Sequence, residues 1–104
     1  RLPAFVGASA RVETSLLAPG SRVDGEVSRS VVGPDCHIEA GAEVHGCVLL
    51  DGVRVITGAR LRNMVVDSGA VVGGATDLDG AKEDPETGIA VVTAAGALEK
   101  PAAD

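Results

Sequence analysis

The sequence of 104 residues has almost no aromatic side chains: Phe5 is its single phenylalanine, and it has no tryptophan or tyrosine. Proteins that bind single-stranded nucleic acid stack the bases on several aromatic rings, and this chain offers no such set. Basic residues are also few, because nine Lys and Arg face fifteen Asp and Glu and leave a formal net charge of −6. These shortages argue against a general nucleic-acid surface.

Cysteine is scarce, and long apolar runs are missing. Cys36 and Cys47 are too far apart for the CxxC spacing of a metal or redox centre. They fall in different columns of the repeat described below, so we expect no disulfide and a reducing, cytoplasmic environment. No apolar stretch approaches the roughly eighteen residues of a membrane span, and the first residues lack a signal-peptide pattern. The composition indicates one domain with a core of modest size.

The sequence does contain a repeat, which is clearest between Val32 and Val72. An aliphatic residue recurs every six, six and then five positions, at Val32, Ile38, Val44, Leu49, Val55, Leu61, Val66 and Val72. A second constrained side chain, here called the partner, follows four residues later, at Cys36, Ala42, Val48, Val53, Ala59, Val65, Ala70 and Thr76. This spacing is typical of hexapeptide repeats, which form a parallel β-helix.

Each six-residue unit is expected to hold one short strand and one corner, so that three units make a triangular coil. We expect the aliphatic residue and its partner to point inward from opposite ends of one flat face. Stacked strands lie about 4.8 Å apart, and a coil buries its inner face only against its neighbours. The partners are sorted by size, which a stacked core requires. Those of the second unit are small (Ala42, Ala59, Thr76), and those of the third unit are bulky (Leu16, Val31, Val48, Val65).

The corners carry glycine, and one of them is shortened. The period is fifteen residues from Ser15 to Ser30, but seventeen from Ser30 to Cys47 and again from Cys47 to Met64. Gly25 lies in the shortened corner and is expected to accommodate the deletion. Other glycines are expected to adopt positive φ at their corners, namely Gly41, Gly52, Gly58 and Gly69.

The repeat fades after Val72, so we expect the β-helix over residues 1–78, as about four coils. Residues 79–104 are expected to hold polar loop, a terminal strand and a tail. The polar stretch DLDGAKEDPETG (Asp77–Gly88) is read as a loop, and IAVVT (Ile89–Thr93) as a strand that covers the edge of the last coil. The alanine-rich end is expected to be frayed. Because the repeat is already running at Val6, we expect the chain to begin inside a longer protein.

His37 and His45 are the only histidines, and the repeat places them outward on different faces. A metal site needs about three protein ligands, so both are interpreted as solvated surface residues. Cys36 is interpreted as a small core residue. Asp35, Asp51 and Asp67 lie at or near corners, where aspartate is a common turn residue. The sequence therefore assigns no catalytic residue and no metal ligand.

One outward column is more distinctive. Arg22, His37 and Arg54 occupy the equivalent outward position in consecutive coils and should stack along one edge. They are either solvated charges balanced by acidic neighbours, or an anion, effector or domain-docking site. The sequence leaves both interpretations open.

The segment SLLAPGSRVDGEVSRSVVGPDCHIEAGAEVHGCVLLDGVRV, followed by GARLRNMVVDSGAVV, resembles one particular β-helix. It is similar to the carboxy-terminal left-handed β-helix of ADP-glucose pyrophosphorylases (glucose-1-phosphate adenylyltransferases), or of related sugar-1-phosphate nucleotidyltransferases. The similarity covers about Ser15–Val72 and extends to the VDG corner of the short coil and the late GIAVV strand. The resemblance implies an all-β, left-handed parallel β-helix.

It also implies a homotetrameric enzyme that converts ATP and glucose 1-phosphate to ADP-glucose and pyrophosphate for glycogen synthesis. Small anionic metabolites regulate this family. Its Mg²⁺ and ATP bind a separate amino-terminal catalytic domain, which this chain lacks. No GxGxR-like loop occurs here, and Lys82 and Lys100 lie in the polar end region. No catalytic residue is carried over, and no cofactor is expected in this segment.

Two functions from different classes follow. The favoured one is an oligomerising and regulatory domain that works with its own catalytic domain and contacts neither nucleic acid nor membrane. The alternative is a stand-alone hexapeptide-repeat acyltransferase or a carbonic-anhydrase-like trimer. That alternative needs a well-placed histidine and usually a protruding loop, and the run Val27–Val72 has no insertion.

Overall fold

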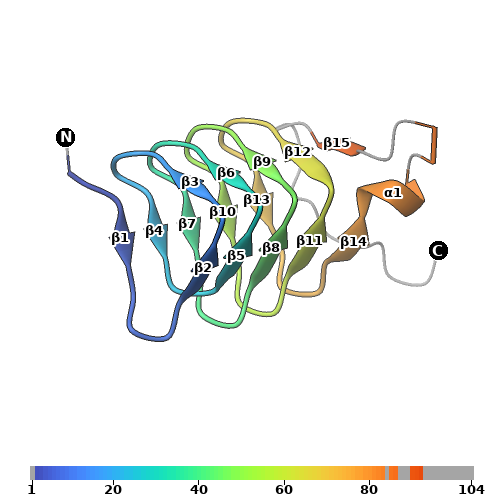
Figure 1. Cartoon of the computed structure of the whole chain (residues 1–104). Coiled ribbons are helices and arrows are strands. Elements are labelled where there is room, and N and C mark those ends of the chain that lie inside the picture. Colours follow the sequence, from blue (N-terminus) through green and yellow to red (C-terminus); the bar gives the residue numbers. More distant parts are fainter. Residues whose placement is uncertain (1, 84, 87–89, 93–104) are drawn as a thin grey trace.

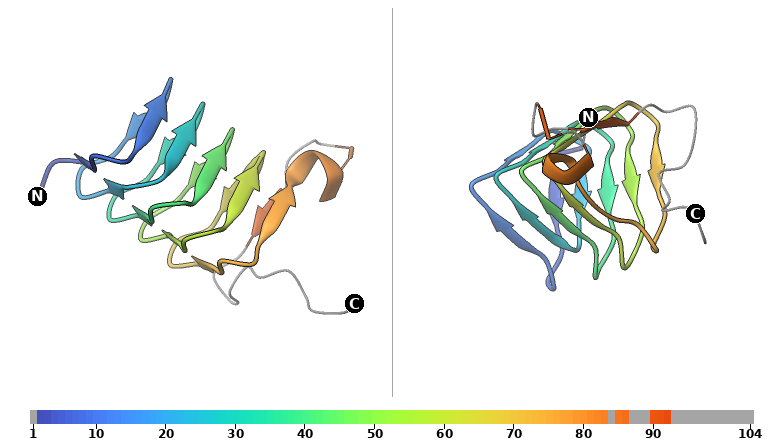
Figure 2. Two further views of the ribbon diagram at one scale, coloured as in Figure 1. Left: turned by 90° about the horizontal axis from the view of Figure 1, so that it is seen from below. Right: turned by 90° about the vertical axis from the view of Figure 1, so that its right-hand side faces the viewer.

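The computed structural model describes residues 2–83, 85–86 and 90–92 of the chain. This part folds into three parallel sheets of five strands each, which the chain visits in turn (Figure 1). The expected all-β parallel β-helix is confirmed. Viewed along its axis it is a triangular coil, with α1 in front at the carboxy-terminal end (Figure 2).

Every coil contributes one strand to each sheet. Sheet A contains β1 (Phe5–Val6), β4 (Arg22–Val23), β7 (His37–Ile38), β10 (Arg54–Val55) and β13 (Val71–Val72). Sheet B contains β2 (Arg11–Glu13), β5 (Glu26–Ser28), β8 (Glu43–His45), β11 (Arg60–Arg62) and β14 (Asp77–Asp79). Sheet C contains β3 (Leu16–Leu17), β6 (Val31–Val32), β9 (Val48–Leu49), β12 (Met64–Val66) and β15 (Ala90–Val92).

The core is the stack of inward side chains between the sheets. The aliphatic positions of the repeat are inaccessible to solvent, with Val32, Ile38 and Val55 each 0% exposed. The small second-unit column is buried as expected, at Ala42, Ala59 and Thr76. The first-unit partners are buried too, at Ser21, Cys36, Val53 and Ala70. Neighbouring coils supply the contacts that one coil cannot make alone.

The predicted position of the partner residue relative to the corner was wrong. An aliphatic residue and its partner lie on either side of a corner, not at the two ends of a flat face. Val32 and Cys36 flank the turn at Pro34–Asp35, and β7 follows at His37–Ile38. Successive side chains of a strand point to opposite sides. Here the partner Cys36 points inward, His37 points outward, and the next aliphatic residue, Ile38, points inward again.

The expected bulky column of the third unit was also wrong. Leu16, Val31 and Val48 are 70%, 42% and 36% exposed, so they point away from the core. The inward residues are those that precede Val31, Val48 and Val65, namely Ser30, Cys47 and Met64, so Cys47 is itself a core residue.

The reason is a tighter corner, in which the inward partner comes three residues after the aliphatic residue and not four. One residue of each such corner adopts the left-handed conformation, namely Thr14 (φ 47°), Arg29 (φ 48°), Gly46 (φ 65°) and Asn63 (φ 54°). The outward valine then sits between two inward residues.

The glycine predictions are confirmed. Gly41, Gly52, Gly58 and Gly69 have φ of 84°, 69°, 96° and 77°. Gly25 is buried in the short corner, where its role is close approach: an added Cβ would lie 2.6 Å from the carbonyl oxygen of Glu39.

The end of the chain is more regular than expected. The predicted loop at Asp77–Gly88 contains β14 and a short helix, α1 (Gly80–Glu83), because Leu78 continues the inward column beside Leu61. The late strand β15 pairs in parallel with β12 and completes sheet C. Residues 89 and 93, and the predicted frayed tail from residue 94, lie outside the described residues. Among the described residues, no helix is long and apolar enough to cross a membrane.

Candidate interaction surfaces

The outward side of sheet C carries a continuous line of aliphatic side chains. They are in register from coil to coil and are here called the apolar column: Leu16, Val31, Val48, Val65 and Val91. Leu16 and Val91, at the two ends, are 70% and 69% exposed. Each column residue occupies the outward position of a strand. The repeat pattern identified most of this column, but we predicted that it lies in the core. A stacked column of bulky aliphatic residues is compatible with a core position as well as with an exposed one.

The apolar column differs from the outward positions of the other two sheets. Sheet B presents mainly charged residues, and the centre of sheet A presents Arg22, His37 and Arg54. Isolated exposed aliphatic residues are normal on a protein surface, whereas a contiguous apolar patch marks an interaction site.

The basic column expected on sheet A is present. Arg22 pairs with His37, and His37 with Arg54, in the parallel register of β4, β7 and β10. The guanidinium of Arg22 also lies 4.8 Å from the centre of the Phe5 ring, a cation–π contact. The stacking inferred from the sequence is therefore confirmed.

Carboxylates already engage the column. Arg22 Nε donates to Asp24 Oδ2 at 2.8 Å, and His37 Nε2 lies 3.4 Å from the same oxygen. Arg54 donates to Glu39 Oε2 from Nε at 3.1 Å and from Nη2 at 2.8 Å. These hydrogen bonds lower the pKa of Asp24 (mainly through Arg22) and of Glu39 (mainly through Arg54). An anion would have to compete with two carboxylates for these arginines.

Sheet B carries two outward polar columns. One contains, in register, Arg11, Glu26, Glu43, Arg60 and Asp77. The other contains Glu13, Ser28, His45, Arg62 and Asp79. Glu26 and Glu43 therefore lie directly opposite each other, as do Ser28 and His45.

The two histidines and the two cysteines lie in different parts of the fold. His37 and His45 lie on different sheets, as predicted. Cys36 and Cys47 are buried free thiols. Burial raises the pKa of Cys47 to about 11 and also raises that of Cys36, whose Sγ donates to the Leu50 carbonyl at 2.8 Å. Neither thiol is therefore a thiolate nucleophile at neutral pH.

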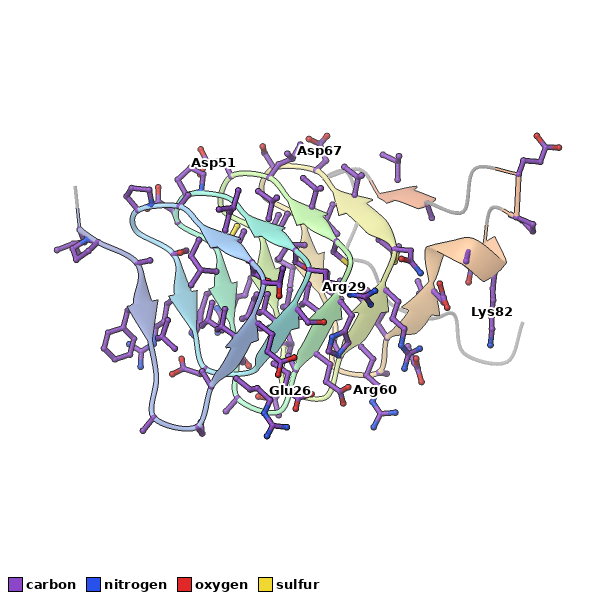
Figure 3. The ribbon with its side chains drawn as sticks, in the orientation of Figure 1. Glu26, Arg29, Asp51, Arg60, Asp67 and Lys82 are labelled. Atoms are coloured by element: carbon purple, nitrogen blue, oxygen red, sulfur yellow. The ribbon has the colours of Figure 1, made fainter. Side chains whose placement is uncertain are left out.

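The aspartates proposed as turn residues lie at or beside corners. Asp35 has a positive φ of 59°, Asp51 is in a turn, and Asp67 Oδ1 accepts the Ser68 N–H at 2.8 Å. Asp51 and Asp67 project from neighbouring corners of the coil (Figure 3). Their positions fit turn formation.

The chain has relatives among glucose-1-phosphate adenylyltransferases. It is 35% identical over 96 residues to the enzyme of Granulibacter bethesdensis. This match covers 85% of the present chain and 23% of the Granulibacter protein. It is 41% identical over 61 residues to the enzyme of Corynebacterium diphtheriae and 34% identical over 61 residues to that of Corynebacterium jeikeium. Each of these matches covers 58% of this chain, and 14% and 15% of the respective relative.

The chain thus spans less than a quarter of the length of these relatives, and the predicted resemblance to them is confirmed. Residues 5–96 also match the family model described as "GlmU-like, C-terminal hexapeptide", which covers nearly the whole β-helix. With its stacked six-residue units and their inward aliphatic columns, the chain belongs to the GlmU-like, C-terminal hexapeptide family.

Proposed function

We propose that this chain is the oligomerising and regulatory β-helix domain of a glucose-1-phosphate adenylyltransferase and is not catalytic by itself. The observation that supports this most directly is the apolar column on sheet C. The names of the relatives supply the reaction class, and the small share of their length that this chain matches leaves room for a separate catalytic domain.

In this proposal the parent protein forms ADP-glucose and pyrophosphate from ATP and glucose 1-phosphate for glycogen synthesis, in the cytoplasm. Mg²⁺ and ATP bind the catalytic domain. The chain has no GxGxR-like loop to hold a triphosphate. The β-helix contributes a rigid surface on which the catalytic domain and further subunits assemble, as a homotetramer.

The apolar column suits a protein partner. Five strands stacked about 4.8 Å apart make a line roughly 19 Å long, comparable to a short helix of a partner protein. Burying exposed aliphatic surface gains about 25 cal/mol per Å². The three inner strands of sheet C, β6, β9 and β12, each pair with both neighbours, so the sheet can bind a partner without rearranging. We assign this surface to the catalytic domain of the same protein.

A chimeric enzyme tests the proposal. This chain would replace the matching segment of the Granulibacter adenylyltransferase, and assembly would be followed by light scattering and activity by pyrophosphate release. We expect an assembled, active chimera, while the isolated chain forms no ADP-glucose. Val31→Glu should lower the activity of the chimera, because it places a charge in the middle of the apolar column that packs on the catalytic domain.

Val71→Glu is a matched control. Val71 has the same residue type, the same outward strand position and the same 42% exposure as Val31, but lies on sheet A. Equal effects of the two substitutions would overturn the assignment of sheet C. Acyl transfer or carbon dioxide hydration by the isolated chain would favour the stand-alone enzyme instead.

The basic column supports a second element of the proposal. We infer that Arg22, His37 and Arg54 form an anion site on sheet A, and that a small anionic metabolite binds it as an effector. Arg22 and Arg54 have side chains 56% exposed, so they can exchange a carboxylate partner for a phosphate. Exposed ion pairs are worth only about 0–1 kcal/mol, so that exchange costs little.

A further inference from the structure

We propose that Glu26, Glu43 and His45 form a binding site for a divalent transition-metal ion such as Zn²⁺, between β5 and β8 on sheet B. One ligand atom from each residue lies within 4.8 Å of the other two. Ligands of zinc sit about 2 Å from the ion and therefore up to roughly 4 Å apart, so small side-chain rotations bring the three into range. The inference does not depend on the proposed function.

The backbone presents these ligands on one face. Glu43 and His45 are two residues apart on β8, so both point outward, and Glu26 lies directly opposite Glu43 on β5. All three residues are partly buried. Glu26 and Arg60 project from the sheet B side of the helix (Figure 3). The ligands therefore come from two adjacent strands held by the ladder of the β-helix.

The histidine ring is oriented for this role. Ser28 Oγ lies 2.6 Å from His45 Nδ1, and His45 Nε2 faces Glu43 Oε1 at 3.5 Å. A histidine that binds a metal through one nitrogen usually has its other nitrogen held by a hydrogen bond. Ser28 is thus placed as a positioning residue, and Nε2 as the ligand atom.

The electrostatics of the site favour a cation. Like charges opposite each other on neighbouring strands destabilise a sheet, and Glu26 and Glu43 form such a pair. A hollow of about 150 Å³ lies beside Glu26, with Arg11, Ser28 and His45 among its other lining residues. This space can hold the water that completes the coordination of an ion with three protein ligands.

Two arginines compete with the ion. Arg60 Nε binds Glu43 Oε2 at 3.1 Å, and Arg11 Nη1 lies 3.8 Å from Glu26 Oε1. Glu43 therefore gives one oxygen to Arg60 and turns the other toward His45. Exposed pairs of this kind are weak, so an ion held by three ligands can displace them. Removing Arg60 should consequently strengthen metal binding, a result that a purely structural role for these residues would not give.

The test measures Zn²⁺ binding to the purified chain by isothermal titration calorimetry, together with the melting temperature with and without ZnCl₂. We expect one Zn²⁺ per chain and a melting temperature raised by about 5 °C or more at saturation. His45→Ala and Glu26→Gln should each reduce the affinity at least about tenfold, and Arg60→Gln should increase it.

His37→Ala is the matched control, because His37 is the other outward histidine and also lies beside a carboxylate, on sheet A. It should bind Zn²⁺ like the unmodified chain. Circular dichroism establishes that each variant is folded. Absence of saturable binding to the unmodified chain, or equal loss in His37→Ala and His45→Ala, would overturn the proposal. So would unchanged binding in both His45→Ala and Glu26→Gln.

Discussion

Gly25 packs against the main-chain carbonyl groups of Glu39 and Ala42 in the next coil. This contact exists because the corner from Val23 to Val27 is two residues shorter than the corresponding corner from Ile38 to Val44. The short corner therefore runs directly beneath the longer corner of the next coil, and only a residue without a Cβ fits against the main-chain carbonyl groups there. Gly25 thus lets a coil of fifteen residues stack on one of seventeen.

Gly25→Ala should therefore destabilise the domain by about 3 kcal/mol, the upper end of the cost of overpacking, because the obstructing atoms belong to the backbone. Urea unfolding monitored by circular dichroism measures the loss. Gly52→Ala is the control: its Cβ would meet nothing within 4 Å, and only its φ of 69° opposes the substitution. We expect about 1 kcal/mol there. A cost for Gly25→Ala no larger than for Gly52→Ala would contradict the close-approach argument.

Val55→Asp should unfold the domain. Val55 is 0% exposed and stacks between Ile38 and Val72, so the substitution places an unpaired carboxylate in the core. The penalty of several kcal/mol is comparable to the whole stability of a small domain. The neighbouring Arg54→Ala should change the free energy of unfolding by about 1 kcal/mol or less, because it removes an exposed ion pair with Glu39. Thermal melts of both variants that gave similar midpoints would refute the inward and outward assignment of β10.

Stability should fall in acid partly through Glu39. Hydrogen bonds from Arg54 and Thr57 lower the pKa of this carboxyl below its usual 4.5 in the folded state. A carboxylate with a depressed folded-state pKa stabilises the fold above its unfolded-state pKa, and this contribution is lost as the pH falls through the folded-state value. The melting temperature should be nearly constant between about pH 5.5 and 7.5 and fall below about pH 4.5.

Glu39→Gln should flatten that acid slope and leave the neutral-pH melting temperature slightly lower. Glu83→Gln, on α1 and away from sheet A, should leave the slope unchanged. The comparison is made by thermal melts from pH 3 to 7. An identical acid slope in Glu39→Gln and the unmodified chain would show that the pair with Arg54 does not contribute to the pH dependence.

The effector proposal is tested in an intact adenylyltransferase that carries this domain. Arg22→Ala combined with Arg54→Ala should raise the half-saturating concentration of an anionic activator about tenfold or more, since hydrogen bonds between charged groups contribute about 1.5–3 kcal/mol each. The rate without activator should stay close to normal. A rate-versus-activator titration makes the comparison, with Arg11→Ala on sheet B as the charge-matched control. An unchanged half-saturation in the double variant would leave Arg22 and Arg54 as ordinary ion-paired surface residues.

Much of this architecture was determined by the spacing of residues along the chain. Aliphatic side chains such as Ile38, Val55 and Val72 recur at the period of a six-residue coil, and they can all be buried only if the coils stack. The alignment of Arg22, His37 and Arg54 follows from the same spacing. The short coil and the role of Gly25 were also evident in the sequence, because a deletion between two inward residues has to be absorbed in the corner that joins them.

The tertiary structure alone decided which of two neighbouring positions faces the core in the third unit. Ser30 and Val31 are both compatible with the sequence pattern, and the choice depends on Arg29 adopting a positive φ, which arginine rarely does. The stacked corners above and below, with their inter-coil hydrogen bonds such as Arg29 N–H to the Glu13 carbonyl at 3.0 Å, hold it in that conformation. This choice turned a supposed core column into an exposed apolar surface. Likewise, only the pairing of β5 with β8 brings Glu26 to Glu43 and His45, because contacts between strands depend on coil length and register and not on adjacency in the chain.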